Sequence, residues 1–177
     1  MIYFGFIIYF KFLERKVNQI AHTLIIILIC GISIVFSMSF PIIILKEIPI
    51  DFRQIPLIIG ALYGGRRVVC ILTAILLVYR FVLGVPDFLS ALFVYSLLLL
   101  LWVVVLPFFK KTAVLKKKLW IALCISLTAA LSTLALNILL FPLAVTATFI
   151  MFAVLIIVLQ TIGLLLCVWM IEKAKKR

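Results

Sequence analysis

Long apolar stretches separated by clusters of basic residues dominate this chain of 177 residues. A helix that crosses a bilayer needs about 20 residues, with a range of roughly 17–25. The second, fifth, sixth and seventh stretches reach that length, while the third is continuously apolar only from Ile55. The pattern predicts an all-α fold, a polytopic bundle of transmembrane helices with about six or seven membrane segments. The predicted segments of this single domain are Met1–Leu13, Leu24–Leu45, Ile48–Gly65, Val68–Leu83, Phe88–Phe109, Leu119–Phe141 and Leu143–Ile171.

The composition excludes a protein that folds in water. Hydrophobic residues make up 68% of the chain and charged residues only 12%. Soluble domains are nearer half apolar and about a quarter charged. A globular protein of this length could not bury so many apolar side chains, so the lipid bilayer must be their solvent. These values exclude a soluble enzyme, a disordered tail and a nucleic-acid-binding domain.

The basic residues give a formal net charge of +12, and their clusters fall on alternate connections of the predicted bundle. Lys46, Arg53 and Arg80 fall on one side, where Glu47, Asp51 and Asp87 balance them. Cytoplasmic connections carry the excess of Lys and Arg, so we predict a multi-pass protein with its C-terminus in the cytoplasm. If every stretch crosses, fourteen of the seventeen basic residues lie on the C-terminal side: Lys11, Arg15, Lys16, Arg66, Arg67, Lys110, Lys111, Lys116, Lys117, Lys118, Lys173, Lys175, Lys176 and Arg177.

The first stretch, Met1–Leu13, differs from the others in its length and its aromatic content. Thirteen helical residues reach only about 20 Å, so whether this segment crosses the membrane stays open. Its Tyr and Phe side chains suit the membrane interface or a thin crossing. No basic region precedes it and no small-residue cleavage site follows it, unlike a signal peptide.

The sequence contains no motif that carries chemistry. Cys30, Cys70, Cys124 and Cys167 are widely separated within apolar stretches, and the single histidine, His22, has no kinase phosphoacceptor motif around it. Neither the spacing of metal ligands nor a glycine-rich nucleotide loop nor a nucleophile motif occurs. We therefore predict no catalytic residue, no metal site and no cofactor.

The segment 48–84 holds the remaining charges, and we expect it to form a helical hairpin that turns at Gly64 and Gly65. From Asp51 to Gly65 and from Arg66 to Arg80 are fourteen steps each. Fourteen helical residues rise about 21 Å, so the Asp51 carboxylate and the Arg80 guanidinium return to the same depth. Ionisable groups inside a bilayer are costly and mark candidate functional sites. Two alternatives stay open: Asp51, Arg53 and Arg80 line an outward-facing pocket, or they reach the outer headgroups and pin the hairpin.

This hairpin resembles the LytS/YhcK-type five-transmembrane receptor (5TM-LYT) domain, the membrane sensor of bacterial histidine kinases and diguanylate cyclases. The family often has Pro after the double Gly and a second Gly after the last one, where this chain has Arg66 and Val85. The resemblance covers most of the chain from about Glu14 onward. The matching residues are Asp51, Arg53, Pro56, Gly64, Gly65, Tyr79, Arg80 and Gly84.

The resemblance implies a sensor module of a bacterial two-component system in the inner membrane, close in style to sporulation sensor kinases. It implies an unknown small ligand and a kinase or cyclase as output domain or partner. The candidates for ligand binding or for pinning the hairpin are Asp51, Arg53, Tyr79 and Arg80. Kinase-linked sensors usually act as dimers, so a homodimer is expected. The chain is then a truncated kinase, a stand-alone sensor or a remnant. The alternative function is a solute-binding transporter subunit, similar to the substrate-binding subunits of energy-coupling-factor vitamin transporters.

Overall fold

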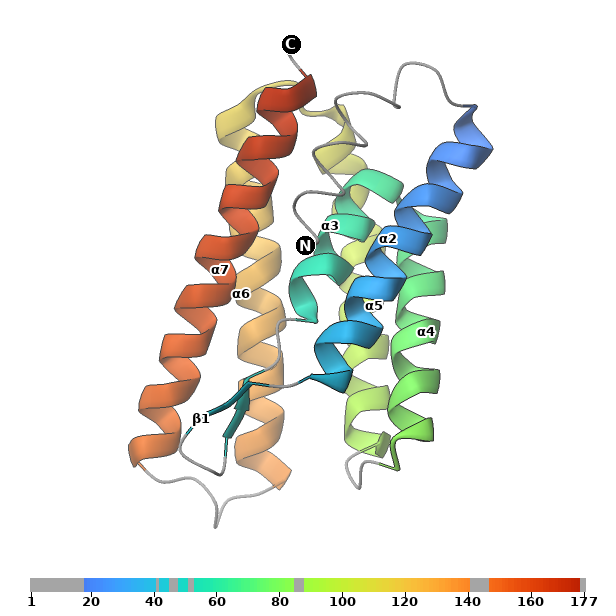
Figure 1. The fold of residues 1–177 in the computed structure, drawn as a ribbon. Helices are drawn as coiled ribbons and strands as arrows, with labels where there is room; N and C mark the ends of the chain where they lie inside the picture. The colour runs from blue at the N-terminus through green and yellow to red at the C-terminus, as the bar shows by residue number, and fades with distance from the viewer. Residues whose placement is uncertain are drawn as a thin grey trace.

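The computed structural model describes residues 18–40, 42–44, 48–50, 53–84, 88–140 and 147–175. Within them the chain forms a bundle in which α2, α4 and α6 run one way and α3, α5 and α7 the other (Figure 1). The prediction of a helical bundle is confirmed. Its elements are α2 (Gln19–Ser39), β1 (Ile42–Ile44), β2 (Ile48–Ile50), α3 (Gln54–Gly64), α4 (Arg66–Val82), α5 (Phe88–Lys111), α6 (Leu115–Leu140) and α7 (Ala147–Lys175).

Four of the described helices are long and apolar enough to cross a membrane. These spans lie in α2, α5, α6 and α7, at Ile20–Ser39, Ala91–Lys111, Leu115–Ala135 and Ala153–Ala174. They support a multi-pass membrane protein. α4 has 17 residues and α3 only 11, which is a rise of about 16 Å, so α3 is too short to cross a bilayer as a straight helix.

The predicted apolar segments Leu24–Leu45 and Ile48–Gly65 are not continuous helices. α2 ends at Ser39, and Ile42–Ile44 pairs with Ile48–Ile50 as an antiparallel hairpin in the register Ile42↔Ile50 and Ile44↔Ile48. A proline disfavours helical torsions in the residue before it, and Pro41 lies two residues after the end of α2. The β-branched isoleucines that follow favour strands. Hydropathy alone did not distinguish these two strands from a helix.

α3 is the central element of the bundle. It packs against α2, α4, α5, α6 and α7, and its residues from Ile55 to Leu62 are all buried. A helix that is apolar on every side is one that is surrounded on every side. A Cβ placed on Gly60 would overlap the side chain of Leu72 and lie 3.1 Å from the Sγ of Cys30. The bare backbone of Gly60 therefore lets α3 approach both α2 and α4 closely.

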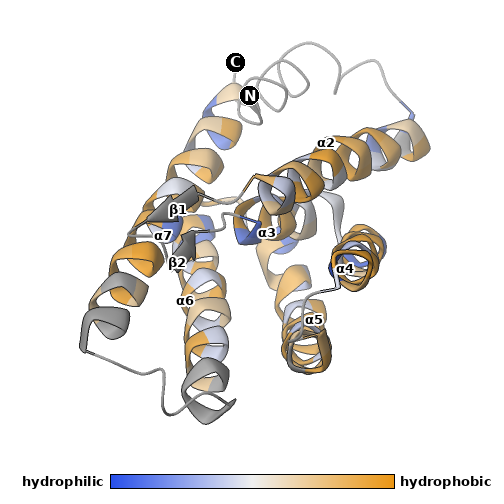
Figure 2. Cartoon of the chain, turned by 60° about the horizontal axis from the view of Figure 1, so that its bottom comes forward, coloured by the Kyte–Doolittle hydropathy of each residue, from blue (hydrophilic) through white to orange (hydrophobic). Residues whose placement is uncertain are grey.

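The outer faces of the helices are apolar, as expected for a surface in contact with lipid (Figure 2). In α2 the buried residues and the exposed residues each recur at a spacing of four. Residues four apart lie on the same face of a helix, so one face of α2 is buried and another is exposed. Large apolar side chains exposed to this extent would be a liability in water and are ordinary in a bilayer. The buried set is Ile26, Cys30, Ile34 and Met38, and the exposed set is Ile20, Leu24, Leu28, Ile32, Phe36 and Phe40.

Candidate ligand site and the polar cluster at the end of α7

Arg53 immediately precedes α3 and faces an aromatic ring inside the bundle. Its guanidinium carbon lies 5.8 Å from the ring centroid of Tyr95 on α5. Tyr95 is only 3% exposed, while Arg53 is half-buried. A guanidinium within about 6 Å of an aromatic face is attracted by the ring quadrupole, more strongly where water is excluded. This contact joins the start of α3 to α5.

Tyr79 and Arg80 occupy the last turn of α4 and are both half-buried. The Tyr79 hydroxyl lies 2.6 Å from the Oγ of Ser39 at the end of α2. Because the Ser39 hydroxyl donates its own proton to the Val35 carbonyl, at 2.8 Å, the Tyr79 hydroxyl is the donor. Tyr79 therefore ties the end of α4 to the end of α2.

Arg80 and Tyr95 lie at about the same distance from the α7 end of the bundle. Tyr95 is fourteen residues before Phe109 and Arg80 fourteen after Arg66, which is about 21 Å in each case. α5 begins seven residues before Tyr95, or about 10 Å further from the α7 end of the bundle. Asp51 lies outside the described residues, so its pairing with Arg80 stays a prediction.

The predicted turn glycines lie at the ends of α3 and α4. Gly64 is the last residue of α3, and Gly65 connects it to α4 with a φ of 89°. Gly84 follows α4 with a φ of 63°. Positive φ values are strained for residues that carry a Cβ. A Cβ on Gly65 would also lie 2.6 Å from the Nζ of Lys110.

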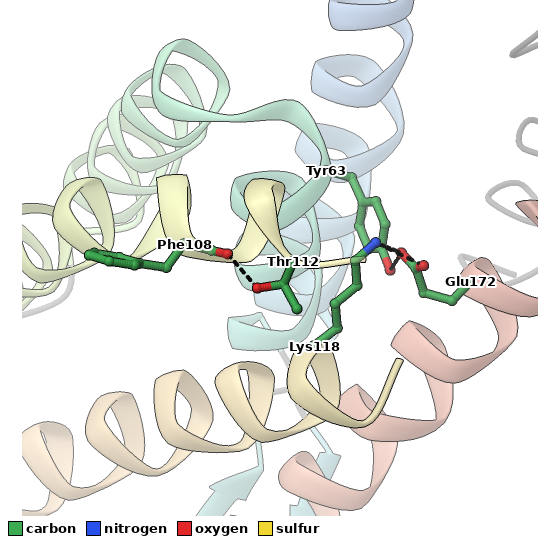
Figure 3. A network of polar contacts seen from close by, with 5 residues as sticks. All are labelled: Tyr63, Phe108, Thr112, Lys118 and Glu172. Carbon is green, nitrogen blue, oxygen red and sulfur yellow. Dashed lines mark hydrogen bonds and ion pairs between the residues drawn. The ribbon is translucent and has the colours of Figure 1, made fainter. Parts of the chain in front are cut away.

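A polar cluster that the sequence did not predict joins three helices at the end of α7 (Figure 3). Glu172 of α7 accepts hydrogen bonds from the Nζ of Lys118 on α6, at 2.8 Å to Oε1 and 2.9 Å to Oε2. The Tyr63 hydroxyl of α3 donates to Oε1 at 3.2 Å. The ring of Phe109 on α5 lies beneath the Lys118 ammonium, 5.5 Å from Nζ, and meets the Tyr63 ring edge-on. The side chains of Lys118 and Glu172 are 17% and 8% exposed, so this is a largely buried ion pair.

Further buried polar atoms lie inside the bundle at other depths. The Oγ of Ser126 on α6 and the Oγ1 of Thr161 on α7 are hydrogen-bonded to each other at 3.1 Å. Among the described residues, the Tyr95 hydroxyl, the Trp102 indole nitrogen and the Thr73 hydroxyl are buried without a hydrogen-bond partner. Such atoms are costly to bury and are available to a polar ligand. The described residues hold no group of His, Cys, Asp and Glu that could bind a metal ion.

Apolar spans and a surface suited to lipid define a multi-pass membrane protein, and its apolar core encloses a few polar and ionisable side chains. The family model "5TMR of 5TMR-LYT" matches residues 7–174, and the chain belongs to this family of membrane sensor domains. The resemblance seen in the hairpin is therefore confirmed. Comparisons with curated proteins and with solved structures found no match.

Proposed function

We propose that this chain is the receptor module of a bacterial signalling system in the inner membrane, with the C-terminus of α7 in the cytoplasm. Membership of a sensor-domain family supports a receptor, and the cluster of Lys and Arg at the α7 end supports the orientation. A histidine kinase or diguanylate cyclase, as an output domain or a partner protein, receives the signal there.

The proposed ligand site is formed by Arg53, Tyr95 and Arg80, with Tyr79 at its edge. Two guanidinium groups favour a ligand that carries an acidic or strongly polar group, because burial strengthens charge-assisted hydrogen bonds. The Tyr95 hydroxyl adds one donor and one acceptor at the same depth. Asp51 belongs to this site as the predicted partner of Arg80.

The observation that carries the proposal is the position of α3 between the ligand site and the end of α7. Arg53 precedes α3 and contacts α5, whereas Tyr63, near the other end of α3, contacts Glu172 of α7. The ten residue steps from Arg53 to Tyr63 rise about 15 Å. A short helix buried along its length moves as a rigid element, so a ligand that shifts its start also shifts Tyr63. Such a ligand must bind one of the two arrangements more tightly.

The experiment uses a chimera in which a histidine kinase catalytic region follows α7, reconstituted in vesicles. We expect Arg53→Gln and Arg80→Gln to abolish the change in autophosphorylation caused by extracts that contain the signal. Lys173→Gln, an exposed residue on α7 near the same output, is the control and should respond normally. Equal responses of all three variants would reject the ligand site. Energised uptake of a solute with an ATPase pair, in place of signalling, would favour the transporter subunit.

A further inference from the structure

Two adjoining hollows follow α2 from the α7 end of the bundle to the other end of this helix. The first is a cavity of about 680 Å³ between the start of α2, the α3–α4 turn and the end of α5. The second is a groove of about 740 Å³ along α2, with Ile75 of α4 on its other side. Leu24 and Ile27 line both, so the two hollows adjoin each other along α2.

The first cavity is strongly basic. Arg66, Arg67 and Lys110 line it and are all exposed. None of its lining residues is acidic. Glu172 is the sole acidic residue in the described part of the chain, and Lys118 already binds its carboxylate. The positive charges of the cavity are therefore not neutralised by any described side chain.

The geometry of the α3–α4 turn adds to this positive potential. α4 begins at Arg66. The first backbone N–H groups of a helix have no carbonyl acceptor within that helix, and in α4 these groups face the α3–α4 turn. Gly65 has no side chain to cover them, and the Lys110 ammonium lies close to it. A helix N-terminus flanked by cations favours a phosphate group.

The second hollow has the opposite chemistry. Nearly all of its lining side chains are apolar, and Gly31 forms part of its floor, with Ile75 at 3.5 Å from an added Cβ. It extends from Leu24 to Ser39, fifteen residues or about 22 Å along α2. One leaflet of a bilayer contributes about 15 Å of hydrocarbon. The groove is thus long enough to hold the acyl chain of a lipid in that leaflet.

We propose that the two hollows together bind one anionic phospholipid, with its phosphate at Arg66, Arg67 and Lys110 and an acyl chain along the groove between α2 and α4. The charges select an anionic headgroup, and the adjoining apolar groove on a membrane-facing surface selects a lipid over a soluble phosphate. The headgroup end of this site lies at the opposite end of α3 from Arg53, and the proposal does not rest on the proposed function.

The first experiment measures lipid binding to the full chain, purified in a neutral detergent, by native mass spectrometry. Phosphatidylglycerol should remain bound, and phosphatidylcholine with the same acyl chains should not. Arg66→Gln and Lys110→Gln should each weaken binding about fivefold, the effect of one basic residue near an anionic headgroup. The control is Lys117→Gln, an exposed residue of α6 at the same end that lines neither hollow. Equal binding of both lipids, or an equal loss in the control, would overturn the proposal.

The second experiment separates a lipid from a free anion. Inorganic phosphate and glycerol phosphate should not displace phosphatidylglycerol, and displacement at millimolar concentration would show a soluble-anion site and overturn the proposal. Gly31→Phe should fill the groove and weaken lipid binding, while Gly31→Ala, which makes only ordinary contacts, should not. Gly31→Phe binding lipid as tightly as Gly31→Ala would also overturn it. The exposed charge variants keep the first test valid if Gly31→Phe does not fold.

Discussion

The ion pair between Lys118 and Glu172 makes a quantitative prediction about how α7 is held. Glu172→Gln keeps the shape of the side chain but removes the charge that faces the Lys118 ammonium at 2.8 Å. Lys118→Met leaves the carboxylate without its cation. Each single change therefore strands one charge in a largely buried place, where α3, α5, α6 and α7 meet.

The magnitude follows from the burial of the pair. Removing one partner of a fully buried ion pair costs about 3–5 kcal/mol. Lys118 keeps 17% exposure at the end of the bundle, so we expect the lower part of that range, about 3 kcal/mol, for each single variant. For a chain of this size that corresponds to a fall of roughly 6–12 °C in melting temperature. The double variant has no stranded charge and should recover at least about 2 kcal/mol relative to the sum of the singles.

The assay is thermal unfolding of the purified chain in detergent, followed by tryptophan fluorescence, for the two single variants, the double variant and Lys117→Met. Lys117 is the exposed neighbour of Lys118 and should leave the melting temperature unchanged. The reasoning is refuted if the single variants shift it by less than about 1 °C, or if the effects of the two changes add without coupling.

Three further changes test the packing of α3 and the interior of the bundle. Gly60→Ala should lower the melting temperature by several degrees because the new Cβ overlaps the Leu72 side chain. Gly31→Ala is the control in the same thermal scan, because its new Cβ has its nearest contact at 3.5 Å. Gly65→Ala should destabilise the chain by about 1–2 kcal/mol in denaturant unfolding because its φ of 89° is strained for alanine. Tyr95→Phe removes a hydroxyl without a hydrogen-bond partner among the described residues, so stability should change by less than about 0.5 kcal/mol while the signalling response of the chimera falls.

The helical bundle and its long helices could be predicted because one physical constraint dominates them. A backbone in lipid must satisfy its own hydrogen bonds, so an uncharged apolar stretch of sufficient length forms a helix. The same constraint does not distinguish the residues just outside the span. Ile42–Ile44 is as apolar as the helix before it, yet it pairs as a strand after Pro41. Its β-branched residues and the proline were the available signals.

The cluster at the end of α7 could not be predicted because its members are far apart in the sequence. Tyr63 and Glu172 are 109 residues apart, and Lys118 and Glu172 are 54 apart. Lys118 occurs within a run of three lysines, and such a run is typical of a helix end that contacts anionic lipid headgroups. An acidic residue among the basic residues of the C-terminal tail was the one signal. Its partner depends on how α6 and α7 pack, which hydropathy does not encode.

The shortness of α3 has a consequence for how the protein enters the membrane. With eleven residues, α3 is too short to span the hydrocarbon core and therefore does not partition into lipid by itself during synthesis. Gly65 turns the chain directly into α4, so α3 and α4 enter together as a helical hairpin. Because α3 packs against helices synthesised both before and after it, its final place is reached only once α5, α6 and α7 have been inserted around it. The element at the centre of the finished bundle is thus among the last to settle.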